Sequence, residues 1–188
     1  MDKIQPKKIL IRATNWIGDA VLTTPAITEI GRKFPEAKVT ILAKPSVAEL
    51  FLKNPFIHEV MIYNDQGRHK GIFGKLRLIL ELRKRRFDLA ILLQNAFEAA
   101  FLSFLAGIPQ RYGYDTDGRT WLLTHPVPLD KETKEKHQLN YYLDLLRPLG
   151  VTASDKKLVL VVAPDEETAA RDRLKQHQVQ RSDVIIGI

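Results

Sequence analysis

The sequence predicts an α/β protein: a parallel sheet with helices packed on both of its faces. Two observations predict this class. Short apolar runs alternate with longer amphipathic segments at short spacing, which is typical of βαβ units. The run Asp88–Leu93 is also almost wholly apolar, as expected of a strand buried on both faces of a parallel sheet. We therefore expect a Rossmann-like lobe.

The elements follow in order along the first 150 residues. The predicted strands are Lys8–Ala13, Val39–Ala43, Val60–Tyr63 and Asp88–Leu93. The predicted helices are Ala20–Phe34, Gly74–Arg86, Ala96–Ala106 and His137–Leu149, the last ending at Gly150.

The same pattern then starts again after Gly150. Lys157–Val162 and Asp183–Ile188 are apolar enough to be strands, and Pro164 begins a charged helix that runs to about His177. We expect residues 1–155 to form one lobe and residues 156–188 to be the start of a second, incomplete lobe.

Composition narrows the classes of function. The chain has no cysteine, which excludes disulfides and thiolate chemistry. The longest apolar run, Ala99–Ile108, is about half of what a membrane span needs, so we expect a cytoplasmic protein. The five histidines lack metal-ligand spacing, so we expect no metal site.

Positive charge is concentrated in one stretch. Residues 68–86 hold eight Lys or Arg and one acid, an excess equal to the net charge of +7 of the whole chain. Such a patch indicates an anionic partner or a solvated face. Leu76, Ile79 and Leu80 fall at helical spacing, so we expect them to pack on the domain while the basic residues face outward.

The loop after the first strand is the first candidate site, because ligands of open α/β sheets bind beyond the carboxyl ends of the strands. It offers Thr14, Asn15, Trp16, Gly18 and Asp19. The loop lacks the glycine-rich pattern that lets a backbone approach a pyrophosphate. It has an acid, Asp19, where the negatively charged phosphate would lie. This combination favours a neutral hydroxyl substrate that a carboxylate can deprotonate. The alternative for Asp19 is a helix N-cap.

A second polar segment surrounds a predicted turn at Asp117. Arg111, Tyr114 and Arg119 lie within nine residues, a mixture of guanidinium and aromatic groups that suits sugar or carboxylate recognition. An ordinary surface loop is the alternative.

Three segments resemble one known family. The string NWIGDAVLTTPAI (Asn15–Ile27) is similar to the N-terminal signature of the ADP-heptose:lipopolysaccharide heptosyltransferases, glycosyltransferase family 9, and most like the type II members. Gln94–Val127 looks like the second signature of the family and Lys136–Gly150 like its inter-lobe helix. Together they span most of the chain in the family order.

The resemblance implies the N-terminal, acceptor-binding lobe of a two-lobed GT-B enzyme that is inverting and metal-independent. It implies that Asp19 is the general base and that Thr14, Asn15, Trp16, Gly18, Arg111, Tyr114 and Arg119 contact the acceptor. The donor, ADP-heptose, would bind mostly in the missing lobe, no cofactor would be needed, and this chain alone would be inactive.

The implied acceptor is heptosyl-Kdo-lipid A, the lipopolysaccharide inner core. With such an acceptor, we expect Arg83, Lys84, Arg85 and Arg86 to meet its phosphates or the anionic cytoplasmic face of the inner membrane. Two other functions remain open. One is a nucleic-acid-binding module that uses residues 68–86, although no binding motif is present there. The other is a nucleotide-sugar-modifying Rossmann enzyme, which the missing glycines disfavour.

Overall fold

The computed structural model describes residues 5–152, 156–180 and 183–186. Its centre is a parallel sheet of six strands in the order β3-β2-β1-β4-β5-β6. The strands are β1 (Lys8–Arg12), β2 (Lys38–Ala43), β3 (Glu59–Ile62), β4 (Leu89–Leu92), β5 (Gln110–Tyr114) and β6 (His125–Val127). This order matches a Rossmann-type doubly wound sheet, so the predicted fold class is confirmed.

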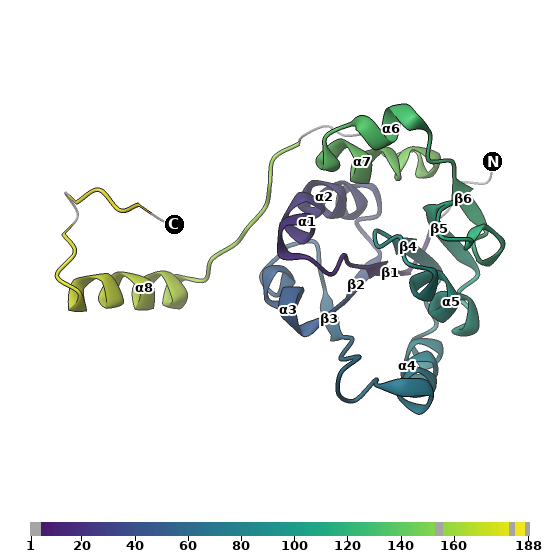
Figure 1. The fold of residues 1–188 in the computed structure, drawn as a ribbon, viewed down its shortest axis with the longest axis horizontal. Coiled ribbons are helices and arrows are strands. Elements are labelled where there is room, and N and C mark those ends of the chain that lie inside the picture. The colour runs from purple at the N-terminus through teal and green to yellow at the C-terminus, as the bar shows by residue number, and fades with distance from the viewer. Residues whose placement is uncertain (1–4, 153–155, 181–182, 187–188) are drawn as a thin grey trace.

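Helices cover both faces of the sheet (Figure 1). One face carries α1 (Ile17–Leu22), α2 (Thr24–Lys33), α3 (Pro45–Ala48) with the 3₁₀ turn η1 (Glu49–Phe51), and α7 (Gln138–Asp144). The other face carries α4 (Gly71–Arg85), α5 (Phe97–Leu105) and the 3₁₀ turn η2 (Thr120–Leu122). The remaining elements are α6 (Lys131–Glu135), η3 (Arg147–Leu149) and α8 (Pro164–Gln176).

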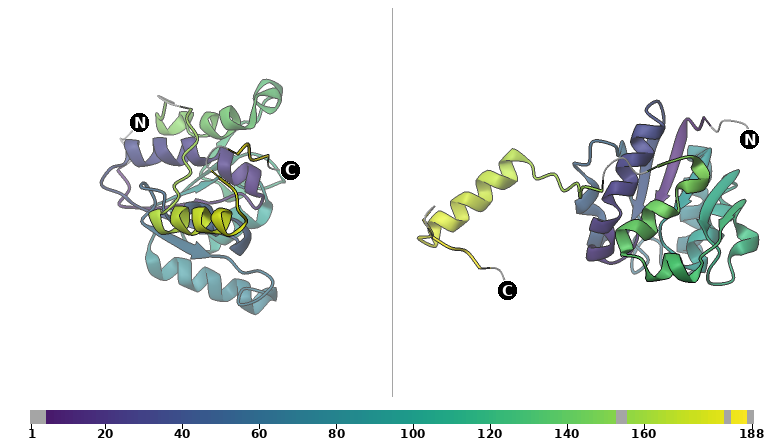
Figure 2. Two further views of the ribbon diagram at one scale, coloured as in Figure 1. Left: turned by 90° about the vertical axis from the view of Figure 1, so that its left-hand side faces the viewer. Right: turned by 90° about the horizontal axis from the view of Figure 1, so that it is seen from above.

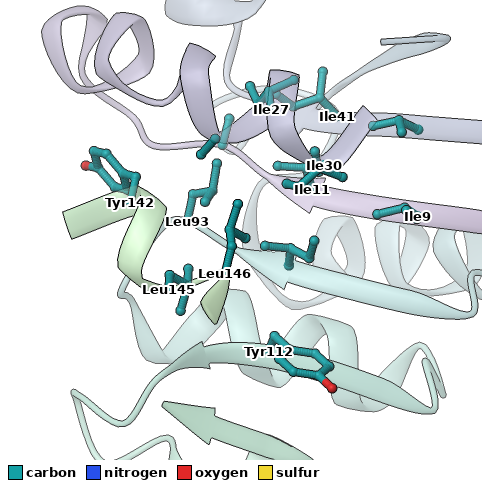
Figure 3. Close-up of a cluster of buried hydrophobic side chains, with 14 of the residues drawn as sticks. Ile9, Ile11, Ile27, Ile30, Ile41, Leu93, Tyr112, Tyr142, Leu145 and Leu146 are labelled. Carbon is teal, nitrogen blue, oxygen red and sulfur yellow. The ribbon is translucent and has the colours of Figure 1, made fainter. Parts of the chain in front are cut away.

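The core follows from the central strand. Ile9 and Ile11 of β1 are fully buried and belong to one apolar cluster with Ile27 and Ile30 of α2 (Figure 3). The alternate residue, Leu10, belongs to the cluster on the opposite face, beneath α4 and α5. Because side chains alternate along a strand, a fully apolar strand can supply both layers.

Two strands are missing from the sequence prediction. β5 reads Gln-Arg-Tyr-Gly-Tyr and β6 reads His-Pro-Val, and neither has the apolar pattern of a buried strand. β5 nevertheless pairs with β4 on one side and β6 on the other. The sequence analysis assigned no strand to either segment, so both strands were missed.

The packing stripe predicted on α4 was also wrong in part. Ile79 is buried, as predicted, but the other buried residues of α4 are Gly74, Leu78 and Leu82. Leu76 and Leu80 are each about half exposed. The reason is geometric: on a 3.6-residue repeat, two apolar stripes fit this sequence, and the helix turns only one of them toward the sheet.

Beyond Gly150, α8 matches the predicted helix, but the predicted strands do not form. Described residues 156–162 and 183–186 are in no strand, and residues 187–188 of the second run lie outside the described residues. A strand needs a partner for its backbone N–H and C=O groups. No described strand lies beside either run, and the apolar side chains of Val162 and Val184 are exposed.

Figure 2 shows α8 standing away from the sheet and its helices. Within the described residues, no helix is both long and apolar enough to cross a bilayer.

Candidate functional site at the carboxyl edge of the sheet

The candidate site lies where β1, β2, β3 and β4 end, the edge at which open α/β sheets bind ligands. The β1–α1 loop passes over this edge. Its start is fixed by the sheet, because Ala13 N–H donates to the carbonyl of Leu42 at 3.0 Å and Leu93 N–H donates to the carbonyl of Arg12 at 3.1 Å. The loop residues are therefore held on a rigid base.

Asp19 is the third residue of α1. The N-cap of that helix is Trp16, which makes no side-chain capping bond, so the N-cap alternative for Asp19 is wrong. The Asp19 side chain is partly exposed. Burial raises the pKa of Tyr142 on α7, and the negative charge of Asp19 raises it further. The carboxylate is thus near the α1–α7 contact and still open to solvent, as a proton acceptor for a bound hydroxyl would need to be.

The other predicted loop residues differ in exposure. Trp16 is 77% exposed, so its ring is not part of the core. Gly18 is exposed and Asn15 is half-buried. Thr14 is buried, and its hydroxyl oxygen has no hydrogen-bond partner. The loop thus presents an aromatic ring, an amide and a carboxylate to solvent, a set that suits the rings and hydroxyls of a sugar.

Arg12 supports this loop from beneath and was not among the predicted site residues. It is 2% exposed and donates through Nη1 to the carbonyl of Ala13 at 2.7 Å and through Nη2 to Oδ1 of Asn15 at 3.1 Å. Its guanidinium also lies 5.2 Å from the ring centre of Tyr63. Burial lowers the pKa of Arg12 to about 10, so it remains charged at neutral pH.

Charged residues at the ends of the neighbouring strands complete the edge. Lys44, which follows β2, forms an ion pair of 2.7 Å with Asp65, which follows β3. The hydrogen bond from Lys44 lowers the pKa of Asp65. Sequence reasoning missed both residues, although Lys44 directly follows one predicted strand and Asp65 comes two residues after another.

Arg119, in the turn between β5 and η2, is fully buried. It donates to the carbonyls of Tyr114 at 2.9 Å, Gln94 at 2.6 Å and Ala96 at 3.3 Å, and to Oδ1 of Asn95 at 2.9 Å. Burial lowers the pKa of Arg119 to about 10. These bonds fasten the β4–α5 loop to β5.

The two other residues of the predicted sugar-binding segment are buried as well. The hydroxyl of Tyr114 donates to the carbonyl of Tyr141 at 2.6 Å. Arg111 lies near the start of β5, away from the carboxyl edge, and donates through Nε to the carbonyl of Leu122 at 2.6 Å. The structure thus does not bring Arg111 together with Asp19, and the contacts of all three residues support the frame around the site.

The basic residues at the end of α4 lie at the opposite edge of the sheet. Arg83, Lys84 and Arg86 are exposed. Arg85 is partly buried and forms an ion pair with Glu59 on β3. Among the described residues, no group of three or more His, Asp or Glu side chains is placed to hold a metal ion.

Comparisons with known proteins agree with this architecture. The family description "Glycosyltransferase family 9 (heptosyltransferase)" matches residues 75–187, more than half of the chain. Lipopolysaccharide heptosyltransferase 2 of Escherichia coli K12 is 30% identical over 125 residues, which are 66% of this chain and 36% of that protein. The matched segment therefore spans well under half the length of this relative.

Two solved structures share the fold. A family 9 glycosyl transferase from Veillonella parvula matches with a TM-score of 0.86 at 23% identity, over 97% of this chain and 54% of that one. The E. coli ADP-heptose lps heptosyltransferase II matches with a TM-score of 0.72 at 24% identity, over 93% and 51%. With the family match over residues 75–187, these findings show that the chain belongs to glycosyltransferase family 9, the heptosyltransferase family.

Proposed function

We propose that this chain forms the acceptor-binding half of an enzyme that transfers heptose from ADP-heptose to the inner core of lipopolysaccharide. Relatives named lipopolysaccharide heptosyltransferase 2 and 3 support the substrate class. The observation that carries the proposal is the position of Asp19. It is an open carboxylate in the first turn of α1, at the ligand-binding edge of the sheet.

In this mechanism the hydroxyl of heptosyl-Kdo-lipid A lies against the β1–α1 loop. Asp19 accepts the hydroxyl proton as the oxygen attacks the anomeric carbon of the donor heptose and ADP leaves. One displacement inverts the configuration, so one base on the acceptor side is sufficient. Asn15, held by Arg12, and the exposed ring of Trp16 orient the acceptor sugar.

The donor contacts belong, in this proposal, to a second lobe that residues 156–188 begin. Two facts support this. The apolar side chains of that segment are exposed, and the chain covers only about half of each solved family structure. The 188-residue chain alone is then expected to bind acceptor and to transfer no heptose. Heptose transfer by the purified chain would contradict this division.

The acceptor is lipid-linked, so we also propose that the protein works at the cytoplasmic face of the inner membrane. Of the residues predicted for this role, Arg83, Lys84 and Arg86 are free to meet an anionic surface, whereas Arg85 is engaged with Glu59. A nucleic-acid role is less well supported, because Arg68 and Lys75 of the same stretch are also held in ion pairs.

The proposal is tested by titrating the chain with delipidated heptosyl-Kdo oligosaccharide in a calorimeter. We expect saturable binding that Asn15→Ala weakens by about threefold to tenfold, the value of one hydrogen bond. Gln176→Ala, on the exposed face of α8, is the matched control and leaves affinity unchanged. Absence of binding, or equal binding by Asn15→Ala, would contradict the placement of the acceptor.

A further inference from the structure

The outer side of α4 exposes an apolar stripe. Phe73 is 89% exposed and Ile72 84%, and Leu76 and Leu80 are each 49% exposed. Phe73, Leu76 and Leu80 recur at spacings of three and four residues, so they lie along one side of the helix. That side is opposite the residues that pack on the sheet. Contiguous exposed apolar surface of this kind usually marks a site of interaction.

A second set of apolar side chains lies on α5 and η2. Phe97, Phe104 and Trp121 are 40%, 41% and 66% exposed. The ring of Trp121 lies 6.3 Å from that of Phe97 and 6.2 Å from that of Phe104, centre to centre. These rings form one partly exposed aromatic cluster that the fold itself holds in place.

The two sets lie on the same side of the sheet. α4 and α5 cover the same face of the sheet side by side (Figure 1), and an ion pair of 2.5 Å joins Lys75 on α4 to Glu98 on α5. We call the surface made by the α4 stripe and the aromatic cluster the α4–α5 face.

Cations border this face. Arg77 and Lys84 lie seven residues apart and therefore on one side of the α4 stripe, and Arg83, seven residues after Leu76, lies nearly in line with Leu76. All three are exposed. The acids of the two helices, Glu81 and Glu98, are held in ion pairs with Arg68 and Lys75. The border is therefore positive overall.

Val159, in the described stretch 156–162, contacts the other side of the sheet. Val159 N–H donates to Oγ1 of Thr24 on α2 at 3.0 Å, and α2 belongs to the cluster opposite α4 and α5. Exposed Phe, Leu and Trp side chains bordered by Lys and Arg are the composition that inserts into the interface of an anionic bilayer.

We propose that the α4–α5 face inserts its apolar side chains into an anionic phospholipid bilayer. This inference rests on the proposed function, because the lipid-linked acceptor is the reason why a membrane is present. It deepens that function by naming the surface that binds the membrane and the way in which it binds. Insertion differs from electrostatic adsorption by the basic residues alone, because apolar burial persists when salt screens the charges.

The chain has two tryptophans, which makes a direct test possible. Trp121 is on the α4–α5 face, and Trp16 is on the β1–α1 loop. The variant Trp16→Phe leaves Trp121 as sole reporter, and Trp121→Phe leaves Trp16. Each is mixed with phosphatidylglycerol–phosphatidylcholine vesicles that carry brominated acyl chains and no glycolipid. We expect a blue shift and quenching for Trp121 and no change for Trp16.

A second measurement separates insertion from adsorption. Phe73→Ser and Leu80→Ser are each expected to weaken vesicle binding by about tenfold, the value of one large apolar side chain, and to do so in both low and high salt. Leu52→Ser is the matched control, because Leu52 is 59% exposed and follows η1 on the opposite face of the sheet. It should leave vesicle binding unchanged.

Several outcomes would overturn the inference: no response of Trp121, an equal response of Trp16, or binding lost entirely at high salt. Sedimentation showing that the α4–α5 face joins two copies of the chain, with the dimer lost in Phe73→Ser, would also overturn it. These outcomes are independent of the acceptor titration, since the vesicles contain no acceptor. If the chain inserts Trp121 into vesicles but binds no oligosaccharide, the proposed function is contradicted and the membrane inference is not.

Discussion

The guanidinium of Arg12 donates a hydrogen bond to the side-chain oxygen of Asn15 over 3.1 Å, from a position buried beneath the β1–α1 loop. The same guanidinium donates to the carbonyl of Leu42 at 3.2 Å, so one side chain ties the loop to β2. Its planar fork suits this task, because a lysine carries all of its N–H donors on one nitrogen and cannot reach the same acceptors together.

Arg12→Lys is accordingly expected to loosen Asn15. Part of the buried hydrogen bonding is lost, so we expect the free energy of unfolding to fall by about 1–3 kcal/mol. Acceptor affinity should fall together with it, to about the level of Asn15→Ala. Calorimetric titration alongside urea unfolding checks both effects. An Arg12→Lys protein with full acceptor affinity would show that Arg12 does not orient Asn15.

Arg119→Lys should destabilise the fold more. The change leaves several of the four acceptors around Arg119 without a donor in a buried place, and each costs about 1–3 kcal/mol. We expect a loss of about 3 kcal/mol or more by urea unfolding. Arg77→Lys, on the exposed side of α4, is the control and should stay within about 0.5 kcal/mol. Equal stability of the two variants would contradict the supporting role of Arg119.

Gly74→Ala tests the closest approach between α4 and the preceding loop. A Cβ at Gly74 would lie 2.3 Å from the carbonyl carbon of His69, so the backbone must shift. We expect a destabilisation of about 1–3 kcal/mol, as for overpacked cores. Gly18→Ala is the control: no atom lies within 4 Å of the added Cβ, and alanine favours the helix by up to about 1 kcal/mol. Thermal unfolding should move the two variants in opposite directions.

His69 gives the fold a pH dependence. Burial lowers its pKa below the ordinary value of 6.5, and its Nδ1 accepts the N–H of Asn64 at 3.1 Å. The unfolded chain therefore binds a proton at this position more readily than the folded chain. The stability is complete above about pH 6.5 and falls as the pH drops through the folded pKa.

An NMR titration of the His69 ring in the folded protein measures this directly. We expect a midpoint below 6.5, and a smaller loss of stability on acidification in His69→Gln. His125 shifts in the same direction through burial, so its ring must be followed separately. A His69 midpoint at or above 6.5 would contradict the assignment.

The first half of the sheet was predictable because its strands are apolar on both sides. Ile9, Ile41 and Ile91 mark β1, β2 and β4 in the bare sequence, and the loop that carries Asp19 follows from where β1 ends. The carboxyl end of a buried parallel strand therefore indicates where the ligand binds, even when the reaction at the site is unknown.

β5 could not be predicted in the same way. Arg111 and Tyr114 look like surface residues in sequence, and they are buried only because carbonyls from η2 and α7 receive their donors. Those acceptors come from segments 11 and 27 residues away. Likewise, the guanidinium of Arg119 could donate hydrogen bonds either to a sugar or to backbone carbonyls. The sequence alone does not distinguish the two, because the carbonyls are brought to Arg119 only when the loop folds.

The role of Asp19 is tested most directly by the turnover number of Asp19→Asn, measured with ADP-heptose and heptosyl-Kdo-lipid A on the two-lobed form of the enzyme that is proposed above. Asn keeps the shape of the side chain and cannot accept the proton, so kcat should fall by about 10²-fold or more. Acceptor affinity and circular dichroism should stay unchanged. Glu36→Gln, an exposed carboxylate beyond the C-terminal end of α2, should keep full activity. An Asp19→Asn enzyme with unchanged kcat would contradict the assignment of Asp19 as the base.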